Sequence, residues 1–185
     1  MLYYLGILGI LIWAVVPFRQ YKKKYFIFFL ALICGDLITL VTRILAHSGT
    51  NFFYVPFSFL ALVSLLDKKF TKKYWIIIAI LFLAFCIINL EYNLVVFSVI
   101  IIHLAILFIL LKSLIVSFAK LRHVNIFLLL LIFYEITLIA KYINYLTGFS
   151  NDYYYYIITT VFEILFGIFF IIYKADDNKL VLQFK

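Results

Sequence analysis

Six ionisable side chains lie inside long apolar runs of the sequence, where a charge is costly. Four of them fall near the middle of their runs: Asp36, His103, Glu135 and Glu163. A charged group at the centre of a membrane-spanning helix costs about 2.5 to 3.5 kcal/mol, so such residues are candidates for ligand binding or catalysis. A desolvated carboxylic acid at this depth could act as a general acid, while a second carboxylate orients water or stabilises a cation.

The other two ionisable groups are cations that lie farther along two of the same runs. Arg43 follows Asp36 by seven residues and Lys141 follows Glu135 by six. At a rise of about 1.5 Å per residue, each cation is displaced by about 10 Å along its helix. Asp36, Thr39 and Arg43 fall at i, i+3 and i+7, which is one face of a helix. Lipid does not solvate such a face, so we expect it to turn towards other helices.

A second polar stripe runs along the last apolar segment. Its members, counted at helical spacing, are Tyr156, Thr159, Thr160, Glu163 and Gly167. A glutamate with hydroxyls three and four residues before it and a glycine four residues after it predicts a close, polar contact with another helix. Tyr142 and Asn144 extend the polar side of the segment that holds Glu135 and Lys141, so three helices carry polar faces. Such faces are buried at least cost against each other, around a cavity.

The cavity has two groups of candidate site residues. The candidate ligand-binding residues are Arg43, His103, Lys141, Thr159 and Thr160, and the candidate catalytic residues, if the protein is a hydrolase, are Asp36, Glu135 and Glu163. A structural interpretation stays open, in which Asp36 or Glu135 pairs with one of the two cations and Glu163 is protonated; a contact with a second subunit is a further alternative. His103 alone is more typical of a hydrogen-bonded core histidine, and no metal-ligand spacing accompanies it, so we expect neither metal nor cofactor.

The composition excludes a water-soluble globule. Of 185 residues, 68% are hydrophobic and 13% are charged, and the mean hydropathy is +1.20. The net charge of +8 does not indicate nucleic-acid binding, because the basic residues lie in short clusters between apolar runs. Cys34 and Cys86 lie within apolar segments without disulfide or zinc spacing. We therefore expect one all-α, membrane-embedded domain.

The apolar runs predict seven helices. A bilayer core of about 30 Å needs roughly 20 residues at a helical rise. The candidate segments are 2 to 18, 25 to 47, 52 to 66, 74 to 90, 94 to 111 with a continuation to 119, 124 to 146 and 153 to 173. The third segment is short for a membrane span, but the distribution of Lys and Arg among the loops favours a crossing.

Fourteen of the 16 Lys and Arg residues fall on one side if all seven segments cross, and the loops on the other side hold none. This positive-inside pattern places the amino terminus outside and the carboxyl terminus in the cytoplasm. The predicted organisation is a seven-helix domain over residues 1 to 173 and a short cytoplasmic tail over 174 to 185. Richness in Phe, Ile, Tyr, Lys and Asn favours a prokaryotic source, hence a bacterial cytoplasmic membrane.

Two short stretches resemble a known membrane family. The sequence Leu-Ile-Cys-Gly-Asp-Leu-Ile over 32 to 38 resembles the Gly-Asp helix of the lysoplasmalogenase (YhhN-like) family, and Phe-Tyr-Glu-Ile-Thr-Leu over 133 to 138 is similar to its later Ser-Asp helix. Tyr134 and Glu135 stand where that family has Ser and Asp. The resemblance implies cleavage of the vinyl-ether bond of lysoplasmalogens, with Asp36 and Glu135 as the acidic pair and Glu163 near a family glutamine.

Three functions follow as hypotheses. The first is a ligand- or lipid-binding, receptor-like or sensory module, or a subunit of a membrane complex. The alternative is a lysoplasmalogenase-like lipid ether hydrolase, and the third is a subunit of a small-solute transporter. The expected partners are membrane lipids and a second membrane-protein subunit, not nucleic acid.

Overall fold

The computed structural model describes residues 2–46, 53–88, 92–148 and 152–183, and it is mostly helical. Its helices are α1 (Leu2–Arg19), α2 (Phe26–Ala46), α3 (Tyr54–Leu65), α4 (Lys68–Lys73), α5 (Trp75–Ile88), α6 (Tyr92–Leu121), α7 (Ile126–Thr147) and α8 (Asp152–Ile172). All seven expected segments are present as helices, each within a few residues of its expected bounds apart from the longer α6. The all-α expectation is therefore confirmed.

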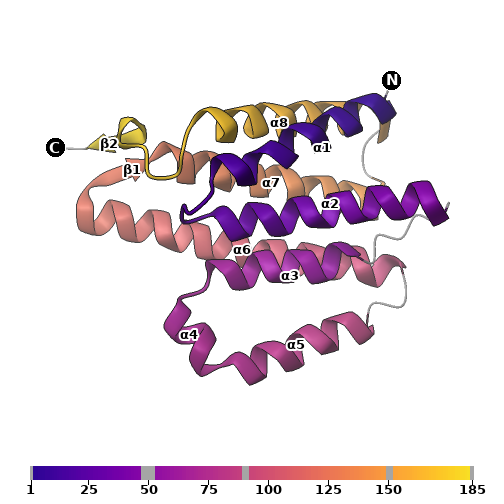
Figure 1. Cartoon of the computed structure of the whole chain (residues 1–185), viewed down its shortest axis with the longest axis horizontal. Helices are drawn as coiled ribbons and strands as arrows, with labels where there is room; N and C mark the ends of the chain where they lie inside the picture. The colour runs from indigo at the N-terminus through magenta and orange to yellow at the C-terminus, as the bar shows by residue number, and fades with distance from the viewer. Residues whose placement is uncertain (1, 47–52, 89–91, 149–151, 184–185) are drawn as a thin grey trace.

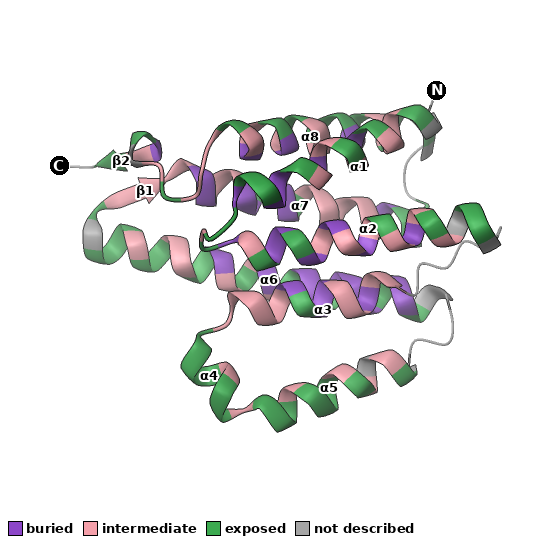
Figure 2. Ribbon diagram, in the orientation of Figure 1, coloured by how far each residue is buried: buried purple, intermediate pink, exposed green. Residues whose placement is uncertain are grey.

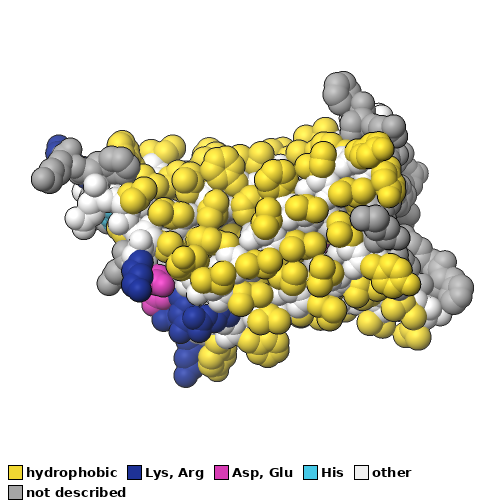
Figure 3. Space-filling view, turned by 90° about the horizontal axis from the view of Figure 1, so that it is seen from above, with side chains coloured by type: hydrophobic (Ala, Val, Ile, Leu, Met, Phe, Trp, Pro, Cys, Tyr) yellow, Lys and Arg dark blue, Asp and Glu magenta, His cyan; other side chains and the backbone are white. Residues whose placement is uncertain are grey.

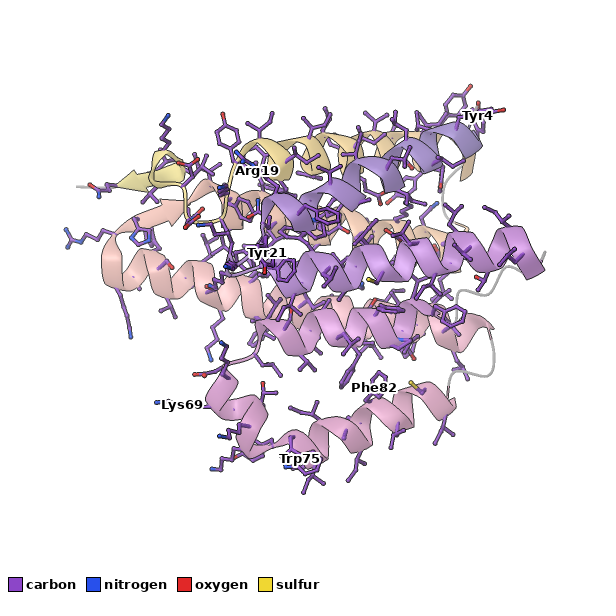
Figure 4. All side chains as sticks on the ribbon, viewed as in Figure 1. Tyr4, Arg19, Tyr21, Lys69, Trp75 and Phe82 are labelled. Carbon is purple, nitrogen blue, oxygen red and sulfur yellow. The ribbon has the colours of Figure 1, made fainter. Side chains whose placement is uncertain are left out.

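The long helices run alongside each other in one bundle (Figure 1). α1 packs against α2 and α8, α3 against α2 and α6, and α7 against α6 and α8. α5 lies at the edge of the bundle and contacts α3 and α4. Its Phe82 points towards α3, where the Phe82 and Phe59 ring centroids are 5.5 Å apart (Figure 4). Most of α5 is otherwise exposed (Figure 2).

The outer surface of the bundle is apolar along its length. Figure 3 shows hydrophobic side chains covering one face and Lys and Arg side chains gathered at one end. Within the described residues, three stretches are long and apolar enough to cross a membrane: Leu94–Lys120, Ile126–Thr147 and Tyr153–Ile172. Shorter apolar helices accompany them. Such a surface is suited to lipid rather than to water.

The two ends of the bundle differ in packing and charge. Figure 4 places Tyr4 at one end and Arg19 and Lys69 at the other. Towards the basic end the interior is filled by aromatic rings, and the ring of Phe170 lies 5.2 Å from Phe29 and 4.9 Å from Phe127, centroid to centroid. All three of these side chains are fully buried. The interior is less completely filled towards the end that carries the amino terminus of α1.

One segment between the expected helices is itself helical. Residues 68–73 form α4, whose N-cap Asp67 accepts a hydrogen bond from the Lys69 backbone N–H at 2.9 Å. α6 runs to Leu121, so the continuation of the fifth segment to 119 is present, and Lys112 and Lys120 lie on this helix. An aspartate before a run of lysines is a recognisable helix start, so the sequence carried a signal for α4.

The carboxyl-terminal segment folds back onto the basic end. β1 (His123–Asn125) and β2 (Val181–Gln183) pair antiparallel with Val124 opposite Leu182, after a single turn of 3-10 helix, η2 (Asn178–Leu180). The buried Gln20 amide Nε2 donates to the carbonyls of Phe170 and Tyr173, both at 2.7 Å, and its Oε1 accepts from the Ala175 N–H at 3.2 Å. The Gln20 side chain therefore fixes the backbone where the chain leaves α8.

An exposed ion pair also joins the α1–α2 turn to this segment. Lys23 Nζ lies 2.6 Å from an Asp176 carboxylate oxygen, and its hydrogen bond holds the pKa of Asp176 below the usual carboxyl range. A lowered pKa stabilises the fold above the ordinary carboxyl pKa, and this contribution is lost as the pH falls through the lowered value. Because the pair is exposed, its effect on stability is small.

α1 and α8 approach closely through Gly167. A Cβ at this position would lie 2.8 Å from Ile12 Cγ2 and 3.1 Å from Trp13 Nε1. The same indole nitrogen donates to the Glu163 backbone carbonyl at 2.9 Å. The expected close contact of the polar stripe on 153 to 173 is thus present, and its partner is α1.

Candidate functional site

A cavity of about 810 Å³ occupies the bundle end that carries the amino terminus. α1, α2, α3, α6, α7 and α8 all contribute to its wall. Its polar lining includes Asp36, Thr39, Tyr54, Ser58, His103, Lys141, Tyr142, Asn144, Thr160 and Glu163. Aliphatic side chains from α1, α2 and α6 complete the wall. The polar faces expected on three helices therefore converge on one cavity, as the sequence predicted.

Lys141 and Glu163 form an ion pair on the cavity wall. Lys141 Nζ donates to both Glu163 carboxylate oxygens at 2.9 Å, from α7 to the neighbouring α8. The two side chains are 25% and 15% exposed, which is consistent with contact with the cavity. The Lys141 ammonium also lies 5.0 Å from the Tyr156 ring centroid. The alternative in which Lys141 pairs with Asp36 or Glu135 is wrong, because α7 and α8 pack side by side and bring Glu163 to it.

Ser58, His103 and Glu135 form a hydrogen-bonded row across α3, α6 and α7. Ser58 Oγ lies 3.1 Å from His103 Nε2, and His103 Nδ1 lies 2.8 Å from Glu135 Oε2. Ser58 and His103 line the cavity, whereas Glu135 is fully buried behind the imidazole. The Tyr142 ring stacks over His103 at 6.2 Å between centroids. His103 is thus a hydrogen-bonded histidine, as expected, but it also faces the cavity.

Asp36 is the cavity carboxylate nearest α3. It lies on α2 beside the Tyr54 hydroxyl, close enough for the two side chains to interact. Thr39, one helical turn farther along α2, also lines the cavity. The side chain of Arg43, the remaining expected binding residue, lies outside the described part of the chain.

The two threonines of α8 differ although both are buried. Thr159 Oγ1 donates to the carbonyls of Tyr155 and Tyr156 in its own helix, at 2.9 and 3.1 Å. Thr160 lines the cavity, and its Oγ1 has no hydrogen-bond partner within the described residues. An unpaired buried hydroxyl costs free energy, so the Thr160 hydroxyl indicates a group to be bound in the cavity.

No pattern in the sequence singles out Ser58. A serine in an apolar helix usually bonds a carbonyl of its own helix, as Ser64 does to Ala61 O at 2.7 Å. Only the packing of α3 on α6 brings Ser58 to His103. Within the described residues, no group of three or more His, Cys, Asp or Glu side chains could hold a metal ion.

Comparisons with known proteins supply no relative. No protein-family model, no curated protein and no solved structure matches the chain. The resemblance of residues 32 to 38 and 133 to 138 to lysoplasmalogenases therefore stays a prediction. The geometry of the cavity is the basis on which a function is argued.

Proposed function

We propose that this is a membrane protein that binds an amphiphilic ligand, a lipid or a lipid-like molecule, in the cavity between its helices. The observation that carries the proposal is the convergence of polar groups, among them the unpaired buried hydroxyl of Thr160, on a cavity of about 810 Å³. Ligand sites are concave, with volumes of about 300 to 1,000 Å³, mostly apolar walls and a few convergent polar groups. The same site would serve a receptor-like module or a subunit of a larger membrane complex.

The apolar and polar parts of the cavity wall fit the alkyl chain and the head group of an amphiphile. Ile7, Ile10, Leu32 and Val99 are among the aliphatic residues that suit an alkyl chain, whereas α2, α3, α6, α7 and α8 supply the polar groups. Lys141 is already neutralised by Glu163, so Asp36 is the surplus charge of the described wall. A head group that donates hydrogen bonds, such as an alcohol or an ammonium, therefore fits better than a phosphate.

The proposal includes the orientation in a bilayer. α1, α2, α3, α5, α6, α7 and α8 would cross, and α4 would lie at the surface with its lysines among anionic head groups. Basic residues at the end opposite the cavity support a cytoplasmic position for that end. The cavity would then open towards the outer leaflet of a bacterial cytoplasmic membrane. Single-cysteine labelling at Leu146 and Lys179 in intact cells tests this orientation.

Thr160→Val tests the assignment of the cavity, with Thr159→Val as its matched control. Valine keeps the shape of threonine and removes the hydroxyl, and one hydrogen bond contributes about 0.5 to 1.5 kcal/mol. We expect the affinity for dodecylamine, measured by native mass spectrometry in a non-ionic detergent, to fall about 3- to 10-fold in Thr160→Val. Thr159→Val is expected to bind like the wild type, because that hydroxyl serves its own helix. Equal losses in the two variants would contradict the assignment.

A further inference from the structure

Ser58, His103 and Glu135 present their polar atoms in a fixed order. The serine oxygen faces Nε2 of the imidazole at 3.1 Å, and the carboxylate faces Nδ1 at 2.8 Å. Each residue comes from a different helix, so the packing of the bundle, and not a local turn, sets the geometry. This arrangement identifies a nucleophile, a base and a group that orients the base, whatever the fold.

The protonation pattern follows from the chemistry of each group. With Glu135 ionised, its oxygens only accept hydrogen bonds, so Nδ1 of His103 carries the ring proton and donates it to Oε2. Nε2 is then the acceptor for the Ser58 hydroxyl. This is the tautomer in which the imidazole can take the serine proton when Ser58 Oγ attacks an electrophile.

The row has one reactive end and one closed end. Ser58 and His103 both line the cavity, while Glu135 has no exposed surface. The Ser58 hydroxyl lies at the cavity wall and is hydrogen-bonded to the His103 imidazole. The Ser64 hydroxyl on the same helix instead donates to the backbone carbonyl of Ala61. A molecule held in the cavity therefore reaches the hydroxyl but not the carboxylate.

We propose that Ser58 is the nucleophile of an acyl-ester hydrolase, with His103 as its general base and Glu135 as a positioning residue. The inference rests on the proposed function, because the cavity must hold the amphiphile whose carboxylic ester is cleaved. Tyr142, stacked on His103, lines the same cavity and supplies a hydroxyl donor for an oxyanion.

The reaction uses water and no other co-reactant. Ser58 Oγ bonds to the ester carbonyl carbon while His103 Nε2 takes the hydroxyl proton. The tetrahedral adduct collapses, the C–O bond to the alcohol breaks, and the departing alkoxide takes that proton from His103. Water then attacks the acyl-serine and gives its proton to His103, and the second collapse returns this proton to Ser58 Oγ and releases the carboxylic acid.

A fluorophosphonate with a dodecyl chain tests the inference on the purified full chain. Attack by Ser58 expels fluoride, so intact mass and peptide mapping are expected to show one phosphonyl group on Ser58 of the wild type. Ser58→Ala is expected to remain unlabelled, and Ser64→Ala to react like the wild type. His103→Gln is expected to slow labelling by about 100-fold or more, because the base is lost.

Glu135 needs a readout that a packing role alone would not change. We expect Glu135→Gln, which keeps the side-chain size, to lose labelling, and Glu135→Asp, which changes the size but keeps the charge, to retain part of the rate. Faster labelling of Glu135→Gln than of Glu135→Asp would overturn the positioning role. Melting curves of each variant check that the fold is kept.

Failure of the inference can be separated from failure of the proposed function. A wild type that binds dodecylamine but is not labelled at Ser58 would overturn the hydrolase and leave the binding cavity in place. A wild type that binds no dodecylamine would overturn the proposed function itself. Labelling of Ser58, together with release of p-nitrophenol from p-nitrophenyl dodecanoate that Ser58→Ala abolishes, would support both.

Discussion

Lys141→Met is expected to lower the free energy of unfolding by about 2 kcal/mol. The substitution leaves Glu163 without its cation on a wall that it shares with Asp36. Removing one partner of a buried pair costs about 3 to 5 kcal/mol, and the partial exposure of these side chains to the cavity reduces that cost. Melting curves in detergent measure the change, with Lys120→Met on the exposed end of α6 as the matched control.

The double variant separates the pair from the individual charges. Lys141→Met with Glu163→Gln removes both charges, so its stability is expected to return to within about 1 kcal/mol of the wild type. Glu163→Gln alone is expected to cost less than Lys141→Met, because the Tyr156 ring stays near the ammonium. Additive losses in the double variant would show that the two side chains do not act as a pair.

Gln20→Ala is expected to destabilise the protein by about 3 kcal/mol and to release the carboxyl-terminal segment. It removes two hydrogen bonds to the carbonyls of Phe170 and Tyr173 and one from the Ala175 N–H. Each contributes about 1 kcal/mol, and the groups left behind are poorly placed to find water. Faster trypsin cleavage after Lys174 and Lys179 would report the released segment.

Gln20→Glu distinguishes hydrogen bonding from packing. Glutamate keeps the length of glutamine but places an oxygen where the amide nitrogen donates to two carbonyls. We therefore expect Gln20→Glu to destabilise at least as much as alanine, while the exposed neighbour Lys22→Ala has little effect. A stable Gln20→Glu variant would mean that packing, not the hydrogen bonds, holds the segment.

The sequence predicted the helices well because apolar runs of this length have few other outcomes. It did not predict the strands β1 and β2, because three-residue strands carry too little pattern to recognise. Gln20 also carried no signal. Its importance comes from a contact with residues about 150 positions away in the sequence, which no local pattern encodes.

The candidate site was predictable in its members but not in its pairings. Depth along each helix follows from counting residues, so Asp36, His103 and Glu163 were expected near one level, with Lys141 about 10 Å farther along its helix, and all four line one cavity. Which side chains meet depends on how the helices neighbour each other and rotate, and counting does not give this. Lys141 therefore has a partner other than those considered, and Glu135 lies behind His103 and away from the cavity wall.

Native mass spectrometry of the wild type beside a cavity-filling variant tests the central claim most directly. Leu138 lines the cavity, and Leu146, two turns later on α7, does not. With dodecylamine, dodecanol and dodecyl phosphate as probes, we expect one bound amine or alcohol in the wild type and in Leu146→Trp, less phosphate, and no bound probe in Leu138→Trp. Equal binding by Leu138→Trp and the wild type would contradict an amphiphile site in this cavity.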